Sequence, residues 1–359
     1  MKKYIFLLSI VVIILAFPCF ASAEKTPEDY ILEFKSILPE ESSGIVENSD
    51  VLLSRFSIKG LLKEIASAVS DEGSDVVAFA LTLLGLVTIS ALASNCHESF
   101  RAQTEAAVGV IASLSVFPTV NEAFSSISAS LSALGEFFTA LTPITVGMTA
   151  LGGGNATAGV QAGGMYTALT IVGGVGSRLF LALSSFGLAI ASTSALGNKS
   201  ASAVGKGIKG LFNWAIGIFT TTITAIFSLQ TLVASAADSA AMRTAKYMAT
   251  GLIPVVGSAV SGALATLASG LTYAKSLVGG GAIAVLVSMA LSPLIMLLIY
   301  RLVFTAAISI STLVGAESCA NSFTAYRFAF DMTISAYVLS VILYLFQIIL
   351  FIKVGVALQ

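Results

Sequence analysis

The sequence predicts an all-α fold: a polytopic α-helical integral membrane protein with a small N-terminal extracytoplasmic helical segment. Of its 359 residues, 56% are hydrophobic and only 10% are charged, and the mean hydropathy is +0.95. Residues 24–75 hold 12 of the 19 acids, whereas residues 76–359 hold 18 charges in all. A soluble protein carries about a quarter charged residues. The composition therefore excludes a soluble enzyme, a disordered chain and a basic nucleic-acid binder, and predicts that a lipid bilayer surrounds most of the chain.

Residues 1–23 have the pattern of a secretory signal peptide. Two lysines precede an apolar run over residues 4–17, and Ala21-Ser22-Ala23 supplies small residues at the two positions that a signal peptidase reads. The alternative is an uncleaved first transmembrane helix, but the acidic segment that follows at once favours cleavage. Cys19 suggests a lipoprotein site, although Pro18 stands where such a site needs a small residue. Cleavage places the next residues outside the cytoplasmic membrane.

The acidic segment, residues 24–75, is predicted to form two helices. Thr26 is suited to cap the first, with Pro27 at its first helical position, and Pro39 is expected to end it. The second helix is expected around 50–69, with one apolar stripe formed by Ile58, Leu61, Leu62, Ile65 and Val69. A segment of this size without a disulfide is too small for a stable core of its own. We expect its stripe to pack on the membrane domain, at the membrane interface or on a partner.

The membrane domain, residues 76–359, is predicted to hold about seven to ten membrane segments. A crossing needs about 20 mostly apolar residues. The strongest candidates are residues 76–94, 179–197, 211–233, 278–300 and 332–352. The run 302–316 is short and reads as a partial helix.

One long uncharged run, residues 137–177, is interrupted by Gly152, Gly153 and Gly154. Consecutive glycines break a helix. We therefore predict two helices, or the two half-helices of a re-entrant hairpin, that meet at this break.

The few charges of the membrane domain predict its loops. Glu122 and Glu136 suit an external loop over 121–136, and the cluster of Lys199, Lys206 and Lys209 suits a cytoplasmic loop. A short break is expected between Asp238 and Lys246, across which Asp238 and Arg243 are able to pair.

No pattern of a catalytic, cofactor or metal site is present, so the sequence predicts a protein that is not an enzyme and binds no cofactor. The single histidine, His97, follows Cys96 directly, which is not a metal-ligand spacing on a helix. The glycine clusters lack the ending of a phosphate-binding loop. No acid stands near the centre of an uncharged run, which disfavours proton-coupled transport.

Three stretches resemble the stage III sporulation protein AE family of endospore-forming bacteria. They are Arg243-Thr244-Ala245-Lys246-Tyr247, Ile253-Pro254-Val255-Val256-Gly257 and Lys275-Ser276-Leu277-Val278-Gly279. The signal peptide, the acidic segment and the stretch from Leu141 to Gly154 also match the layout of the family. The external segment is shorter than is usual in the family. Within these stretches we select Arg243, Lys246, Pro254, Gly257 and the glycine triplet as candidates for assembly or structure.

The resemblance implies a membrane component of a transenvelope channel between mother cell and forespore, located in the mother-cell membrane. The implied partners are the other proteins of the stage III sporulation A set: its membrane subunits, the AA member that resembles secretion ATPases, and the ring-forming AG and AH members. A second hypothesis is a stand-alone permease with a solute site at the break of Gly152 to Gly154, as broken helices in transporters suggest. Too few polar groups remain to name a site for intramembrane catalysis.

Overall fold

The computed structural model describes residues 25–39, 58–94, 98–174, 178–195, 199–252 and 257–354. These residues are helical apart from short turns, and they contain no strand, so the predicted all-α class is confirmed. The signal-peptide prediction for residues 1–23 and the candidate Pro254 lie outside the described residues.

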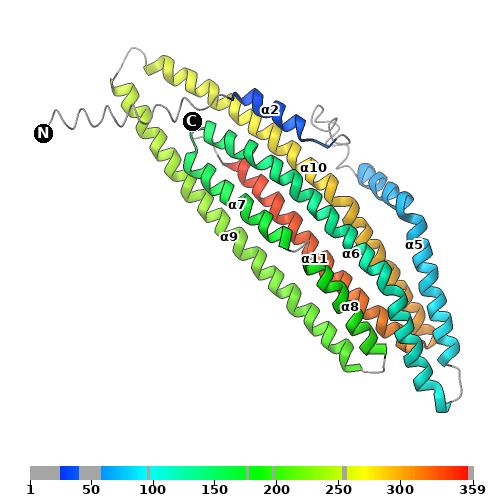
Figure 1. Cartoon of the computed structure of the whole chain (residues 1–359). Coiled ribbons are helices and arrows are strands. Elements are labelled where there is room, and N and C mark those ends of the chain that lie inside the picture. The colour runs from blue at the N-terminus through cyan, green and yellow to red at the C-terminus, as the bar shows by residue number, and fades with distance from the viewer. Residues whose placement is uncertain are drawn as a thin grey trace.

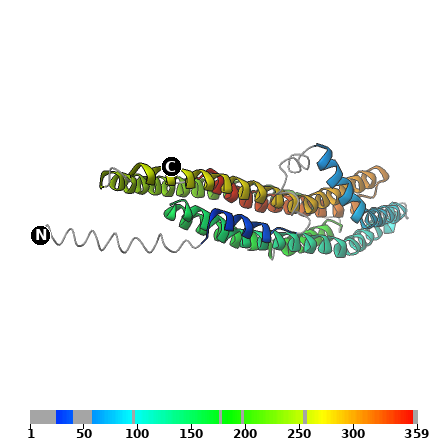
Figure 2. The ribbon, with the colours of Figure 1, turned by 90° about the horizontal axis from the view of Figure 1, so that it is seen from above.

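Eight helices account for almost all of the described chain. Their bounds are α2 (Pro27–Ser36), α5 (Ile58–Ser94), α6 (Glu98–Leu151), α7 (Asn155–Gly174), α8 (Phe180–Ala195), α9 (Lys199–Leu252), α10 (Gly257–Val314) and α11 (Glu317–Lys353). The helices run side by side along one elongated bundle, with α9 at one edge and α5 at the other (Figure 1). Seen from above, α9, α10 and α11 form one layer and α6, α7 and α2 the other (Figure 2).

The first helix, α2, forms as the sequence predicts. Thr26 and Asp29 make a reciprocal capping box, because the Asp29 main-chain N–H donates to the Thr26 hydroxyl while the Asp29 carboxylate accepts from the Thr26 N–H. The bonds from the Thr26 main chain and side chain hold the pKa of Asp29 below its ordinary value. The fully buried Phe34 and the close approach of Tyr30 to Gly147 anchor α2 on the bundle.

The central helix is α11, which packs against α6, α8, α9 and α10. Its aromatic side chains fill much of the interior, and Tyr326, Tyr337, Tyr344, Phe323, Phe330 and Phe351 are among the largest fully buried side chains. Phe304 of α10 is surrounded by aromatic rings, with centroids 5.9 Å away at Tyr326 and 5.5 Å away at Phe330. Offset and edge-on aromatic pairs of this kind add about 0.5–1.5 kcal/mol each beyond the burial of their area.

Five helices are long and apolar enough to cross a membrane among the described residues: α5, α6, α9, α10 and α11. The chain is therefore a multi-pass membrane protein. Each of the five strongest predicted spans falls in a different helix, with residues 179–197 represented by the shorter α8. The count of seven to ten membrane segments stays a prediction.

Several predicted loops are instead continuous helix. Residues 121–136 lie inside α6, the lysine cluster lies in the first turns of α9, and residues 238–246 lie inside α9. Residues 302–314, for which the sequence predicts a partial helix, extend α10. The predicted second helix of the acidic segment is likewise continuous with the first span, because α5 runs unbroken from Ile58 to Ser94. The cause is that one or two charges do not end a helix; a helix ends where the backbone is forced out of it.

The C-terminal ends of α6 and α10 lie where a glycine takes the backbone out of the helical conformation. Gly153 and Gly315 are the two glycines with positive φ among the described residues, at 79° and 82°. At the first, the Gly154 N–H donates to Thr149 O and the Gly153 N–H to Ala150 O; at the second, Ala316 and Gly315 donate in the same way to Ser311 and Thr312. This pair of bonds is the Schellman motif. The predicted break at the glycine triplet is therefore confirmed, and it joins two antiparallel helices.

The longest helices exceed the thickness of a single bilayer. At 54 to 58 residues, α6, α9 and α10 are each about 80–87 Å long, against a hydrocarbon core of about 30 Å. Part of each helix therefore lies outside the hydrocarbon core, if the helices run along the membrane normal. The positions of the few interior charges along the bundle therefore become the main indication of which part of each helix lies inside the membrane.

Candidate functional site

The glycine triplet lies against a buried carboxylate from a distant helix. Asp238 of α9 is only 8% exposed, and its two oxygens accept hydrogen bonds from the main-chain N–H groups of Ala156 at 2.9 Å and Thr157 at 2.7 Å. These are N–H groups of the first turn of α7, which have no partner within their own helix. Because Gly154 at the cap position has no side chain, Asp238 takes the place of a local N-cap residue and also complements the helix dipole.

Small polar side chains surround this turn on the inside of the bundle. Thr149 Oγ1 lies 2.8 Å from Gln161 Oε1, and both residues are buried. The hydroxyl of Thr157 and the amide nitrogen of Gln161 are buried without a hydrogen-bond partner among the described residues. A Cβ at Gly154 would lie 3.1 Å from Thr149 O and 3.6 Å from Asp238 Oδ2. The triplet therefore serves as a tight, polar turn that requires glycine.

A second polar centre joins the three helices of one layer. Asp331 of α11 accepts a hydrogen bond from Arg301 Nε of α10 at 2.5 Å and pairs through its other oxygen with Lys209 Nζ of α9. The Asp331 side chain is 10% exposed, whereas those of Lys209 and Arg301 are 28% and 42% exposed. One acid thus holds two bases, and the partial exposure of the bases lowers the strength of the pairs relative to fully buried ones.

A third centre joins two of these helices, α10 and α11, near the C-terminal end of α11. Lys275 of α10 is 3% exposed, donates from Nζ to Val354 O at 2.9 Å and lies over the Phe351 ring at 5.0 Å. Val354 is the C-cap residue of α11, so a cation from a neighbouring helix complements the negative end of that helix. Four residues further along α10, a Cβ at Gly279 would lie 2.3 Å from Ile352 Cγ1, so the two helices touch there.

The two charged levels bound three uncharged stretches of similar length. On α9 the stretch is residues 210–237, on α10 residues 276–300 and on α11 residues 332–352. At 1.5 Å per residue these stretches are about 32–42 Å long, which is close to the thickness of a bilayer. The sequence shows where these runs end, but not that Lys209, Arg301 and Asp331 lie together at one set of ends.

The outward face of α6 differs from those of α5 and α9. Along it runs a series of exposed small or acidic residues, here called the α6 polar stripe: Glu122, Ser125, Ser126, Ala129, Ser132, Ala133, Glu136 and Thr139. Between Leu114 and Tyr166 no large hydrophobic side chain is exposed, whereas α5 exposes Val77, Leu81, Leu84, Ile89 and Leu92. Lipid favours large apolar side chains, so the stripe is not a lipid-facing surface.

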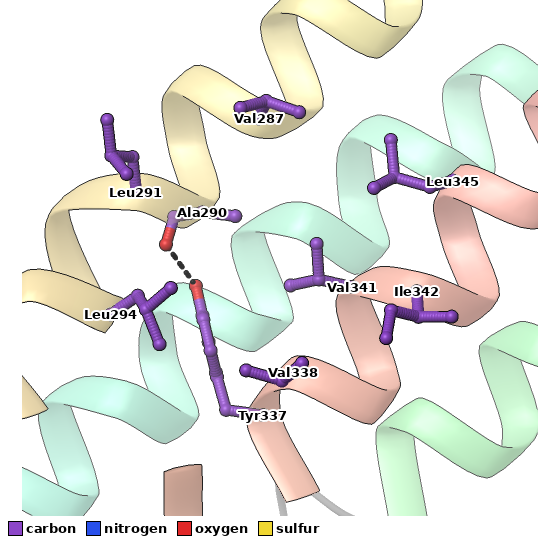
Figure 3. Close-up of a pocket in the computed structure, with 9 residues that line it drawn as sticks. All are labelled: Val287, Ala290, Leu291, Leu294, Tyr337, Val338, Val341, Ile342 and Leu345. Atoms are coloured by element: carbon purple, nitrogen blue, oxygen red, sulfur yellow. Dashed lines mark hydrogen bonds between the residues drawn. The ribbon is translucent and has the colours of Figure 1, made fainter. Parts of the chain in front are cut away.

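An apolar groove runs between α10 and α11 (Figure 3). It has a volume of about 190 Å³ and is lined by Val287, Ala290, Leu291, Leu294, Tyr337, Val338, Val341, Ile342 and Leu345. The one polar side-chain group among these lining residues, the Tyr337 hydroxyl, donates to the main-chain carbonyl of Ala290 at 3.2 Å. The groove therefore offers no free polar group for chemistry. Among the described residues there is also no group of side chains able to hold a metal ion.

The structure places the remaining candidates on the same end of the bundle as the glycine turn. Arg243 is exposed on α9, five residues and thus about 7.5 Å of helix rise beyond Asp238. Lys246 lies one turn later on α9, and Gly257 is the first residue of α10. The predicted pairing of Asp238 with Arg243 is wrong, because the helix is continuous there and the carboxylate bonds to α7 instead.

A family comparison decides what this arrangement belongs to. The family model described as stage III sporulation protein AE matches residues 46–357. The chain belongs to the stage III sporulation protein AE family. The match spans α5 to α11 and therefore includes the glycine turn, both charged levels and the α6 polar stripe. No curated protein and no solved structure matches the chain. The family makes this a sporulation-related membrane protein.

Proposed function

We propose that the chain is a non-enzymatic integral component of the transenvelope sporulation channel that links mother cell and forespore. It resides in the mother-cell membrane with its N-terminal segment extracytoplasmic, and it works with the other stage III sporulation A-set proteins in endospore development. The observation that carries this proposal is the family match over residues 46–357. The channel role is what the resemblance to this family implies.

The α6 polar stripe supports assembly with other membrane subunits. Small residues allow helix backbones to approach closely, which is the main source of helix association in lipid. The hydroxyls of Ser132 and Thr139 in the stripe already donate to main-chain carbonyls of their own helix, so they do not require water. The two glutamates are exposed and have no basic partner among the described residues. A protein partner is therefore a better neighbour for this face than lipid.

The geometry of the glycine turn weighs against the stand-alone permease. Transporters with broken helices aim a free helix N-terminus at their solute. Here the corresponding N–H groups of α7 are occupied by Asp238, and the turn itself is closed by the Schellman bonds of Gly153 and Gly154. A solute would have to displace the carboxylate before it could bind.

Site-specific photo-crosslinking in an endospore-forming host tests the proposal. A photoreactive residue at Ala129 or Ala133 of the stripe should form adducts with other A-set membrane proteins, identified by mass spectrometry. The matched positions Leu229 and Leu232, exposed on α9 at 63% and 66%, should form few or none. Adducts with lipid alone at all four positions would contradict the assembly role.

Two further observations separate the hypotheses. The coding sequence should lie among the other genes of the set in a spore former. Specific solute uptake by the purified protein alone in liposomes would instead favour the permease.

A further inference from the structure

The cluster around Asp331 carries more positive charge than its own acid neutralises. Besides Lys209 and Arg301, Arg327 lies one helical turn before Asp331 on α11, and Lys209 and Arg327 both lie over the Phe328 ring, at 5.4 and 5.9 Å. Three bases thus accompany one acid. No other acid of the three helices is near, since α10 has none, α9 has only Asp238 and α11 has otherwise only Glu317. Counted over these three helices, the cluster has a formal excess of two positive charges.

The bases are held in place, yet part of their hydrogen-bonding capacity faces outward. Arg301 contacts Asp331 through Nε, and its side chain is 42% exposed. A guanidinium bonded through Nε keeps its two terminal nitrogens for an external oxyanion. Asp331 therefore orients Arg301 and Lys209 without saturating them.

The level of the cluster along the bundle fits a membrane interface. On one side lie the uncharged stretches of α9, α10 and α11, and on the other α10 continues without charge from Leu302 to Val314. A bilayer that covers these uncharged stretches of about 32–42 Å has its headgroups at the cluster. The exposed Leu298 and Leu302 flank Arg301, and the only tryptophan, Trp214, is 66% exposed five residues after Lys209. Tryptophan and basic side chains are enriched where acyl chains meet headgroups.

We propose that Lys209, Arg301 and Arg327 bind the phosphate of an anionic lipid headgroup, with the acyl chains along Leu298 and Leu302. The inference does not depend on the channel role, since it rests on charge, exposure and level alone. Anionic headgroups are attracted by about 1 kcal/mol per nearby base, which corresponds to about fivefold in binding.

Fluorescence quenching of the full-length protein in vesicles tests the site. A single-tryptophan reporter, Trp214→Phe with Leu302→Trp, is reconstituted in phosphatidylcholine that contains a small fraction of brominated phosphatidylglycerol or brominated phosphatidylcholine. We expect the brominated phosphatidylglycerol to quench the reporter selectively. Arg301→Gln and Arg327→Gln should each lower this preference about fivefold. Lys353→Gln, at the other charged level, removes the same charge about 33 Å along α11 from Asp331 and should leave the preference unchanged.

The outcomes decide the proposal even if one variant folds poorly. Arg327 makes no bond to Asp331 in the structure, so Arg327→Gln tests the charge without removing the Arg301 pair. Equal quenching by both brominated lipids, or a preference that survives both Arg301→Gln and Arg327→Gln, would overturn the site. Loss of the preference on addition of inorganic phosphate would indicate that the cluster binds a soluble phosphate compound, and would overturn the proposal of a lipid site.

Discussion

Asp238 and Thr157 are 81 positions apart in the chain, and the Asp238 carboxylate accepts a 2.7 Å hydrogen bond from the Thr157 main-chain N–H. The bond joins the long edge helix α9 to the first turn of α7, and a parallel bond to Ala156 completes the cap. The turn of the glycine triplet is thereby fixed to the very helix that carries Arg243 and Lys246. Two stretches of sequence selected for separate reasons therefore form one structural unit.

Replacing Asp238 with Ala should destabilise the protein by about 1–2 kcal/mol, because two N–H groups of α7 lose their buried acceptor. Asp238→Asn keeps one acceptor oxygen and should lose less. Thermal unfolding of the purified protein in detergent measures both. Arg243→Ala, exposed on the same helix, is the matched control. If Asp238→Ala unfolds at the temperature of the control, the carboxylate does not cap α7.

At the glycine triplet, Gly153→Ala should cost about 1–2 kcal/mol, because a Cβ is strained at a φ of 79°. Gly154→Leu should be worse and should reduce assembly, since its Cβ meets Thr149 O at 3.1 Å. Unfolding temperature and membrane yield report the two effects. Gly159→Ala, on α7 with nothing within 4 Å of the added Cβ, should be tolerated. Equal behaviour of all three variants would show that the turn does not need glycine.

The contact between α10 and α11 predicts a compensating pair. Gly279→Ala places a Cβ 2.3 Å from Ile352 Cγ1 and should destabilise the protein by about 1–3 kcal/mol through overpacking. Ile352→Ala in the same chain should restore part of the loss. The adjacent Gly280→Ala, which has nothing within 4 Å, should have little effect. Parallel unfolding of the wild-type protein, Gly279→Ala, Ile352→Ala and the double variant measures the coupling energy between the two positions. Additive effects at positions 279 and 352 would mean that the helices do not touch there.

Removing the acid of the charged cluster should have a larger effect than removing one base. Asp331→Asn leaves Lys209 and Arg301 without their common partner and should cost about 2 kcal/mol, less than a fully buried pair because both bases are partly exposed. The addition of Arg301→Gln should recover part of this loss. Unfolding midpoints of the single and double variants give the coupling energy. A double variant no better than Asp331→Asn would exclude repulsion between the two bases.

Sporulation tests the candidates at the end of α9. Arg243→Ala with Lys246→Ala should lower spore yield without abolishing membrane insertion, since both bases lie beyond Asp238 at the end of the helix that holds the glycine turn. Heat-resistant spore counts and membrane fractionation measure the two properties. A normal spore yield from the double variant would contradict a role of Arg243 and Lys246 in assembly.

The sequence by itself determined the class of the protein, the break at Gly152 to Gly154 and the start of α2 at Thr26 and Pro27. Each follows from local chemistry: lipid requires long apolar helices, consecutive glycines release the backbone, and a threonine followed by a proline favours a helix start. The tertiary structure alone decided that α6 and α9 run through the predicted loops, and that Asp238 and Asp331 have partners 82 and 122 positions away. Apolarity along a chain indicates which residues avoid water, but the partner of a buried charge depends on which helices lie side by side.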